Sequence, residues 1–336
     1  MAPLLLMLSL DAPGAHRIHA GSPRKKGLRL DVVGHVGKAV RELRVDHLPS
    51  LGHFRDLPRP MGHGGFSLAI AELCVRFEGL DAELLESARG RYAPFLCEEQ
   101  PQHTVTLYPG AAVYLDPAAD GFLRVLERPL EGARLYLSTD FAAWWADGTG
   151  AGILRVSNPE DREATLRAME NYLRWVTAGL ALRREAFVLH AAGLVREGKA
   201  YVFFGPSGAG KSTVAALSPG CGLLSDDLVL LLRRDGRWMA AATPFKGTLS
   251  QSAKKAGTFP LEGLFRLVQA PRHAAKVLTP ARGLATLLAS CPFVTDPAAR
   301  HDRLMTLAAD CCRQTGVREL QFAKDSGFWE SIAGEK

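Results

Sequence analysis

The stretch FVLHAAGLVREGKAYVFFGPSGAGKST, residues 187–213, decides the fold. Two apolar runs, Phe187–Val195 and Tyr201–Phe204, flank a short turn that contains Gly198, and this pattern is typical of an antiparallel hairpin. The second run leads directly into a glycine-rich loop, and a helix-forming segment follows the loop. The order of strand, glycine-rich loop and helix predicts an α/β fold.

The loop matches the pattern G-x-x-x-x-G-K-S/T. Its glycines let backbone amides approach phosphate oxygens, and the start of the following helix adds a partial positive charge. The lysine reaches the β- and γ-phosphates, and the hydroxyl can ligate Mg²⁺. The loop therefore predicts a site for a nucleoside triphosphate, ATP, with Mg²⁺. The predicted nucleotide-binding residues are Gly205, Pro206, Ser207, Gly208, Ala209, Gly210, Lys211, Ser212 and Thr213.

Two acids and a histidine near the loop are candidates for the chemistry of transfer. Asp226 and Asp227 precede the apolar run Leu228–Leu232, where one carboxylate would hold Mg²⁺ and the other would accept the proton of an attacking hydroxyl. Alternatively, the two acids form an ordinary solvent-exposed turn and have no role in the chemistry. His190 lies on the first strand of the hairpin, which brings it near the loop, although a core histidine would fit the same pattern. The predicted catalytic residues are His190, Lys211, Asp226 and Asp227, and the predicted metal ligands are Ser212 and Asp227.

These elements together resemble the HPr kinase/phosphorylase family. The matching residues are His190 in Leu-His-Ala-Ala-Gly, the loop Gly205–Ser212, and the pair that ends at Asp227 in Leu-Ser-Asp-Asp. The resemblance covers mainly residues 187–232. It implies the mixed-sheet P-loop kinase fold shared by HPr kinase and phosphoenolpyruvate carboxykinase. It also implies ATP, Mg²⁺ and a seryl hydroxyl of a protein or peptide as acceptor, with Asp226 as base, Asp227 as metal ligand and His190 beside the transferring group.

Some features depart from authentic HPr kinases. The interval between Lys211 and the Asp pair is shorter, and the glycine-rich signature associated with phosphorolysis has no clear copy. Its nearest counterpart is Thr243–Gly247. Either Lys246 would contact phosphate there, or the segment would form an ordinary surface turn. These departures weigh against HPr as substrate and against the reverse phosphorylase reaction. The chain looks more like the divergent HPr-kinase-like proteins associated with modification of ribosomally made peptides, so we expect a serine kinase for a precursor peptide.

Other classes of nucleotide-binding protein fit less well. A small-molecule P-loop kinase carries a similar loop, but such enzymes begin close to it, whereas more than half of this chain precedes Gly205. An ABC-type transport ATPase would show an LSGGQ-like helix start, which the sequence lacks. A nucleotide-binding regulator without catalysis is the alternative that the sequence excludes least.

The sequence predicts four segments: a flexible N-terminal arm (1–62), a small β-rich domain (63–150), a connecting helix (151–185) and an HPr-kinase-like P-loop domain (186–336). Expected strands are Leu68–Val75, His103–Leu107, Ala111–Leu115 and Gly121–Val125 in the β-rich domain, and Val317–Phe322 near the end. Expected helices are Asp81–Tyr92, Asn158–Arg183 and Asp296–Thr315. Asn158 is expected to cap the second helix, and its predicted buried stripe is Leu166, Met169, Leu173, Val176 and Leu180.

The composition is that of an ordinary globular protein, with 47% hydrophobic and 23% charged residues. The net charge of +6 comes with no basic run interleaved with aromatics, so we expect no nucleic-acid partner. The apolar run Leu4–Leu10 is too short to span a bilayer, so we expect no membrane partner. The six cysteines form no CxxC pair, which favours reduced thiols in a cytoplasmic protein. Homo-oligomerisation stays open.

Overall fold

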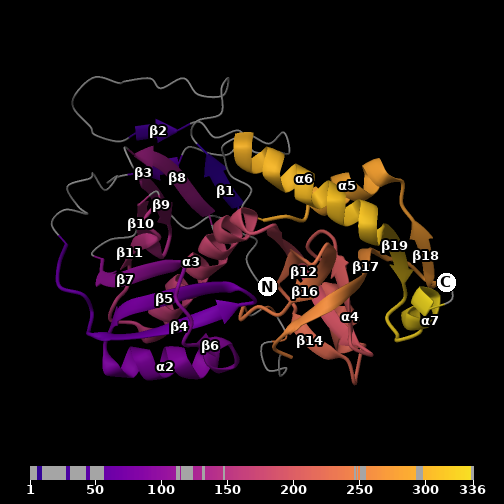
Figure 1. Ribbon diagram of the computed structural model, residues 1–336, viewed down its shortest axis with the longest axis horizontal. Coiled ribbons are helices and arrows are strands. Elements are labelled where there is room, and N and C mark those ends of the chain that lie inside the picture. Colours follow the sequence, from indigo (N-terminus) through magenta and orange to yellow (C-terminus); the bar gives the residue numbers. More distant parts are fainter. Residues whose placement is uncertain are drawn as a thin grey trace.

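The computed structural model describes residues 6–9, 28–30, 43–45, 57–110, 114, 124–130, 133–146, 148–245, 247, 249, 255–292 and 298–333. These residues form an α/β fold with two large mixed sheets (Figure 1). Helix α3 lies between the sheets and contacts strands of both. One continuous cluster of buried apolar side chains includes residues from both sheets and from α3. The β-rich part and the part that carries the glycine-rich loop therefore share a core.

The first sheet has nine strands in the order β1-β8-β9-β10-β11-β7-β5-β4-β6. Their bounds are β1 (Leu6–Ser9), β4 (Gly64–Ile70), β5 (Leu73–Leu80), β6 (Leu96–Cys97), β7 (His103–Pro109), β8 (Arg124–Leu130), β9 (Ala133–Ser138), β10 (Phe141–Ala146) and β11 (Ala151–Val156). A separate pair consists of β2 (Leu28–Leu30) and β3 (Leu43–Val45). The sheet extends past the boundary predicted at residue 150, since β11 pairs with β10 and β7.

Two expectations for this region differ from the structure. The run expected as one strand, Leu68–Val75, folds into the β4–β5 hairpin, because the chain turns at Ala71, whose φ is +52°. In the expected flexible arm, β1 pairs in parallel with β8, and most other residues of that arm lie outside the described residues. The strand expected at His103–Leu107 is confirmed as β7. The strand expected at Ala111–Leu115 lies, except for Tyr114, outside the described residues.

Helix α3 (Arg162–Arg183) begins later than expected. Asp161, rather than Asn158, caps it, because the Asp161 carboxylate accepts a hydrogen bond of 3.0 Å from the backbone amide of Ala164. Residues 158–161 form a preceding turn. The predicted stripe is confirmed, since Leu166, Met169, Leu173, Val176 and Leu180 are all buried. Helix α2 (Ala82–Tyr92), capped by Asp81, also agrees with the prediction.

The second sheet has eight strands. They are β12 (Ala186–Arg196), β13 (Lys199–Phe204), β14 (Gly222–Ser225), β15 (Leu228–Arg234), β16 (Arg237–Ala241), β17 (Thr258–Gln269), β18 (Ala274–Val277) and β19 (Val317–Phe322). The predicted hairpin is confirmed, because β12 and β13 pair antiparallel around Glu197 and Gly198. Strands β13, β17 and β19 are parallel, so their carboxyl ends meet at one edge.

The second sheet also closes on itself. Strand β13 pairs with both β12 and β17, and β12, β15, β16 and β17 pair in succession, so these five strands form a ring. The ring is possible because β12 and β17 are long enough to pair with different partners along their length. Strand β14 pairs with residues 193–195 of β12, on the same edge of β12 as β15.

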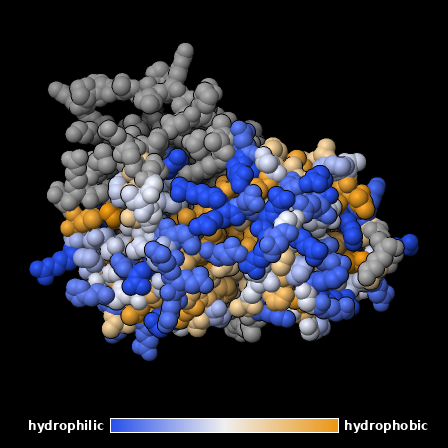
Figure 2. All heavy atoms as spheres, viewed as in Figure 1, coloured by the Kyte–Doolittle hydropathy of each residue, from blue (hydrophilic) through white to orange (hydrophobic). Residues whose placement is uncertain are grey.

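The remaining helices cover the second sheet. They are α4 (Lys211–Ala216), α5 (Pro280–Leu288), α6 (Ala298–Thr315) and α7 (Phe328–Ala333). A short 3-10 helix, η1 (Ala93–Phe95), precedes β6 in the region of the first sheet. Helix α6 ends at Thr315 as predicted, while Asp296 lies outside the described residues. Within the described residues, no helix has the length and hydropathy of a membrane span. The face in Figure 2 is mainly hydrophilic, with apolar residues scattered between charged ones.

Candidate functional site

The glycine-rich loop, residues 205–210, connects β13 to α4 at the carboxyl edge of the parallel strands. Gly208 and Gly210 have φ angles of +82° and +107°, which side chains with a Cβ rarely adopt. A Cβ at Gly210 would also collide with the ring of Phe322 at the end of β19. In addition, the Gln269 amide at the end of β17 donates a hydrogen bond of 2.7 Å to the Gly208 carbonyl. The loop is therefore held by the ends of the other two parallel strands, β17 and β19.

Lys211 is buried at the base of the loop. Its Nζ donates hydrogen bonds to the carbonyl oxygens of Gly205, at 2.9 Å, and Pro206, at 3.2 Å. Burial lowers the pKa of Lys211, while the negative charge of Asp227 acts in the opposite direction. Helix α4 is only six residues long. A helix this short contributes little dipole, so the positive charge at the loop is mainly that of Lys211.

His190 and Asp227 meet beside the loop, as the hairpin predicts. The register pairs Ala191 with Phe204, so His190 is the next position and lies across from the start of the loop. On its other side β12 pairs with β15, and His190 stands opposite Leu228. The Nδ1 atom of His190 lies 3.5 Å from Oδ1 of Asp227. The imidazole, one carboxylate and the buried lysine thus converge on one end of the second sheet.

Arg174 of α3 also belongs to this cluster, and the sequence analysis did not identify it. Its Nε and Nη2 atoms donate to Oδ2 of Asp227 at 3.1 and 2.9 Å. Burial opposes ionisation of Asp227, but hydrogen bonding from His190 and the charge of Arg174 together hold the pKa of its carboxyl below the usual range. The sequence signal was a charged pair four residues apart on α3, Glu170 and Arg174.

A polar network extends from Arg174 to the first sheet. Arg174 pairs with Glu170 at 2.6 Å and donates to the Asn171 side chain at 2.9 Å. Asn171 in turn donates to Asp140, in the turn between β9 and β10, at 2.7 Å. The Arg174 guanidinium also lies over the ring of Phe245, 5.4 Å from its centroid. The position of the Asp227 carboxylate is therefore coupled to the packing of the first sheet against α3.

The two adjacent acids have different partners. Asp226 is 4% exposed, and its oxygens accept hydrogen bonds from the backbone amides of Gly247, at 3.1 Å, and Leu249, at 2.6 Å. The Ser225 hydroxyl accepts from the amides of both Asp227 and Leu228, which stabilises the turn that separates the two carboxylates. Asp226 thus holds the connection after β16, whereas Asp227 faces Arg174 and His190. Lys246 lies outside the described residues.

Ser212 is half-buried in the first turn of α4, next to Lys211. Within the described residues, no group of three or more His, Cys, Asp or Glu side chains is arranged to hold a metal ion. Mg²⁺ in nucleotide sites usually takes one or two protein ligands and obtains the rest from phosphates and water. The hydroxyl of Ser212 and the carboxylate of Asp227 are suitable in chemistry for that limited role.

The fold and the site define an α/β protein with mixed sheets, in which a glycine-rich loop, a buried lysine and a His–Asp–Arg cluster meet at one sheet edge. The chain belongs to the family of the SynChlorMet cassette protein ScmC, because the family model matches residues 153–323, just over half of the chain. The matched range contains Arg174 and all of the predicted site residues, and leaves most of the first sheet outside. A comparison with curated proteins gave no match.

Proposed function

We propose that this protein is a cytoplasmic ATP- and Mg²⁺-dependent kinase, which transfers the γ-phosphoryl group to a seryl hydroxyl of a peptide or protein. The observation that carries the proposal is the convergence of Lys211, His190 and Asp227 at the glycine-rich loop. A loop of this kind also occurs in proteins that only bind nucleotides. The additional imidazole and carboxylate favour group transfer, because both lie beside the loop that would hold the phosphates.

In this scheme the loop amides and Lys211 hold the triphosphate. Lys211 exchanges its present carbonyl acceptors for phosphate oxygens, which are stronger acceptors because they are charged. Ser212 and Asp227 hold Mg²⁺, which when bound neutralises charge on the β- and γ-phosphates. The kinase fold of the HPr kinase type belongs to the same proposal, and the hairpin that feeds the loop supports it.

The different partners of the two acids lead us to revise their expected roles. Both oxygens of Asp226 accept hydrogen bonds from backbone amides of the connection after β16. We therefore assign Asp226 to holding the connection after β16. Asp227, together with His190, positions the attacking hydroxyl. A loose phosphoryl-transfer transition state needs positioning more than a strong base, so the low pKa of Asp227 is compatible with this role.

Incubation of the purified protein with radiolabelled ATP, Mg²⁺ and a Ser-containing peptide array tests the proposal. We expect label on Ser peptides, no label on matched peptides with Ala in place of Ser, and no label with the Lys211→Ala variant. Label found only on small metabolites would instead identify a small-molecule kinase. Binding of ATP without any transfer would identify a regulator.

A further inference from the structure

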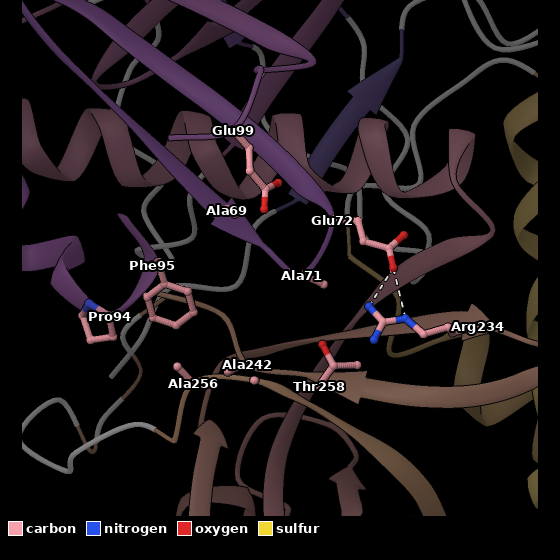
Figure 3. Close-up of a pocket in the computed structure, with 11 residues that line it drawn as sticks. Ala69, Ala71, Glu72, Pro94, Phe95, Glu99, Arg234, Ala242, Ala256 and Thr258 are labelled. Atoms are coloured by element: carbon pink, nitrogen blue, oxygen red, sulfur yellow. Dashed lines mark hydrogen bonds and ion pairs between the residues drawn. The ribbon is translucent and has the colours of Figure 1, made fainter. Parts of the chain in front are cut away.

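A cavity of about 410 Å³ lies between the two sheets, at a place distinct from the glycine-rich loop (Figure 3). One wall comes from the β4–β5 turn, with Ala71, and from the segment around Phe95 and Glu99. The opposite wall comes from the second sheet, with Ala242 just after β16 and Thr258 at the start of β17. Both parts of the molecule therefore build this cavity.

The lining combines small or apolar residues with polar ones, which are Glu72, Glu99, Arg234 and Thr258. Alanines supply much of the wall, and Phe95 is 7% exposed, so its ring forms part of the packed base. Small side chains leave room for a long side chain and its neighbouring backbone, and the volume falls within the range of ordinary ligand sites. The cavity can thus accept one extended side chain with apolar stem atoms.

The charge of the cavity is negative. Arg234 binds Glu72 through Nε at 3.1 Å and Nη2 at 2.6 Å, so these two charges offset each other. The Glu99 carboxylate points toward the cavity from the other side (Figure 3). Among the described residues, no cation pairs with the Glu99 carboxylate. A ligand with an apolar stem and a positive end fits this arrangement, whereas a carboxylate would be repelled.

The cavity is connected to the candidate active site through the chain after β16. This connection leaves the cavity wall at Ala242 and returns to it at Gly257, where the Ala242 amide donates to the Gly257 carbonyl at 3.0 Å. Between these points the amides of Gly247 and Leu249 bind the Asp226 carboxylate. Residues 242–257 therefore line the cavity at both ends and bind the acid next to Asp227 in between.

We infer that this cavity is the docking site for a Lys or Arg side chain of the acceptor peptide. The aliphatic stem packs on Phe95 and the surrounding alanines, and the positive end pairs with Glu99. The inference rests on the proposed function for the statement that the docked peptide is the phosphate acceptor. The preference for a basic side chain rests only on the cavity.

The test uses the full chain on an array of Ser-containing peptides, in which one position at a time is Lys, Arg, Gln, Leu or Glu. Binding of fluorescently labelled protein is measured without ATP, and transfer is measured separately with radiolabelled ATP. The variants are Glu99→Gln and Glu99→Lys. The matched control is Glu98→Gln, which removes the neighbouring exposed acid that does not line the cavity.

We expect wild type and Glu98→Gln to bind peptides with Lys or Arg at one position about fivefold more tightly than those with Gln, as for an exposed ion pair. Glu99→Gln should lose this preference, and Glu99→Lys should prefer Glu. Absence of a basic preference in wild type, or its persistence in Glu99→Gln, would overturn the docking site even if Ser peptides become labelled. A basic preference that depends on Glu99 without label on any Ser peptide supports the docking site and rejects the kinase proposal.

Discussion

Replacing Arg174 with Met should destabilise the protein strongly near neutral pH. Arg174 and Asp227 have side-chain exposures of 15% and 8%, and two hydrogen bonds of 2.9 and 3.1 Å join them. Breaking a buried pair by removing one partner costs about 3–5 kcal/mol, because the other charge stays buried. His190, 3.5 Å from the same carboxylate, compensates in part, so we expect about 3 kcal/mol. Methionine retains most of the packing of the arginine stem.

The pH dependence of the free energy of unfolding distinguishes the loss of the Arg174–Asp227 ion pair from a loss of packing. In the wild type the pKa of Asp227 is lowered, so the stabilisation is present above the ordinary carboxyl pKa and is lost only as the pH falls through the lowered value. In Arg174→Met the burial of Asp227, which raises its pKa, is no longer opposed by the arginine, while His190 still opposes it. The pKa of the variant carboxyl should therefore be higher than that of the wild type, and the stability deficit measured at about pH 5 should be smaller than the deficit at about pH 8.

Urea unfolding at both pH values measures the free energy of unfolding. The matched control is Arg167→Met, an exposed arginine on the same helix, for which we expect a change within about 0.5 kcal/mol. The double variant Arg174→Met/Asp227→Asn should recover part of the loss, because it removes the buried charge. If Arg174→Met were as stable as the control at both pH values, the ion pair would contribute nothing and the reasoning would be refuted.

Three further predictions concern the loop and the acids. Lys211→Ala should abolish phosphoryl transfer, measured with radiolabelled ATP, because a buried phosphate-facing charge is removed; wild-type rates would contradict the scheme. Asp227→Asn should lower kcat by about 10²-fold or more, whereas Asp226→Asn should chiefly lower thermal stability through the connection after β16. A larger kcat loss in Asp226→Asn would instead support Asp226 as the base and Asp227 as the metal ligand. Gly210→Ala should weaken ATP binding in calorimetry, because its Cβ meets the Phe322 ring, while Gly198→Ala, with open space around it, should not.

The network from Asp140 to Asp227 gives the first sheet a physical connection to the candidate active site. Asn171 and Arg174 are neighbours on one face of α3, and they contact the β9–β10 turn on one side and Asp227 on the other. A shift of α3 relative to the second sheet would move the Arg174 guanidinium, and with it the Asp227 carboxylate. The cavity is also lined by residues of both sheets, so it lies where the same two parts of the molecule meet.

The features that the sequence determined by itself are local ones. The hairpin, the glycine-rich loop, the buried stripe of α3 and the strand β19 follow from residue types within a few positions of each other, where backbone preference and side-chain period are decisive. The cap of α3 shows the limit of this reasoning. Asn158 and Asp161 are both good capping residues, and residue type alone did not distinguish them, whereas in the structure Asp161 is the cap.

Only the tertiary structure decided which distant groups meet. Arg174 is 53 positions before Asp227, and Asp226 is 21 positions before Gly247, so no local pattern relates them. The closed ring of strands, the position of β11 in the first sheet and the cavity beside Glu99 also depend on how separate segments pack. Contacts of this kind depend on how separate segments pack around a shared core. That packing follows from the whole sequence and not from any local pattern.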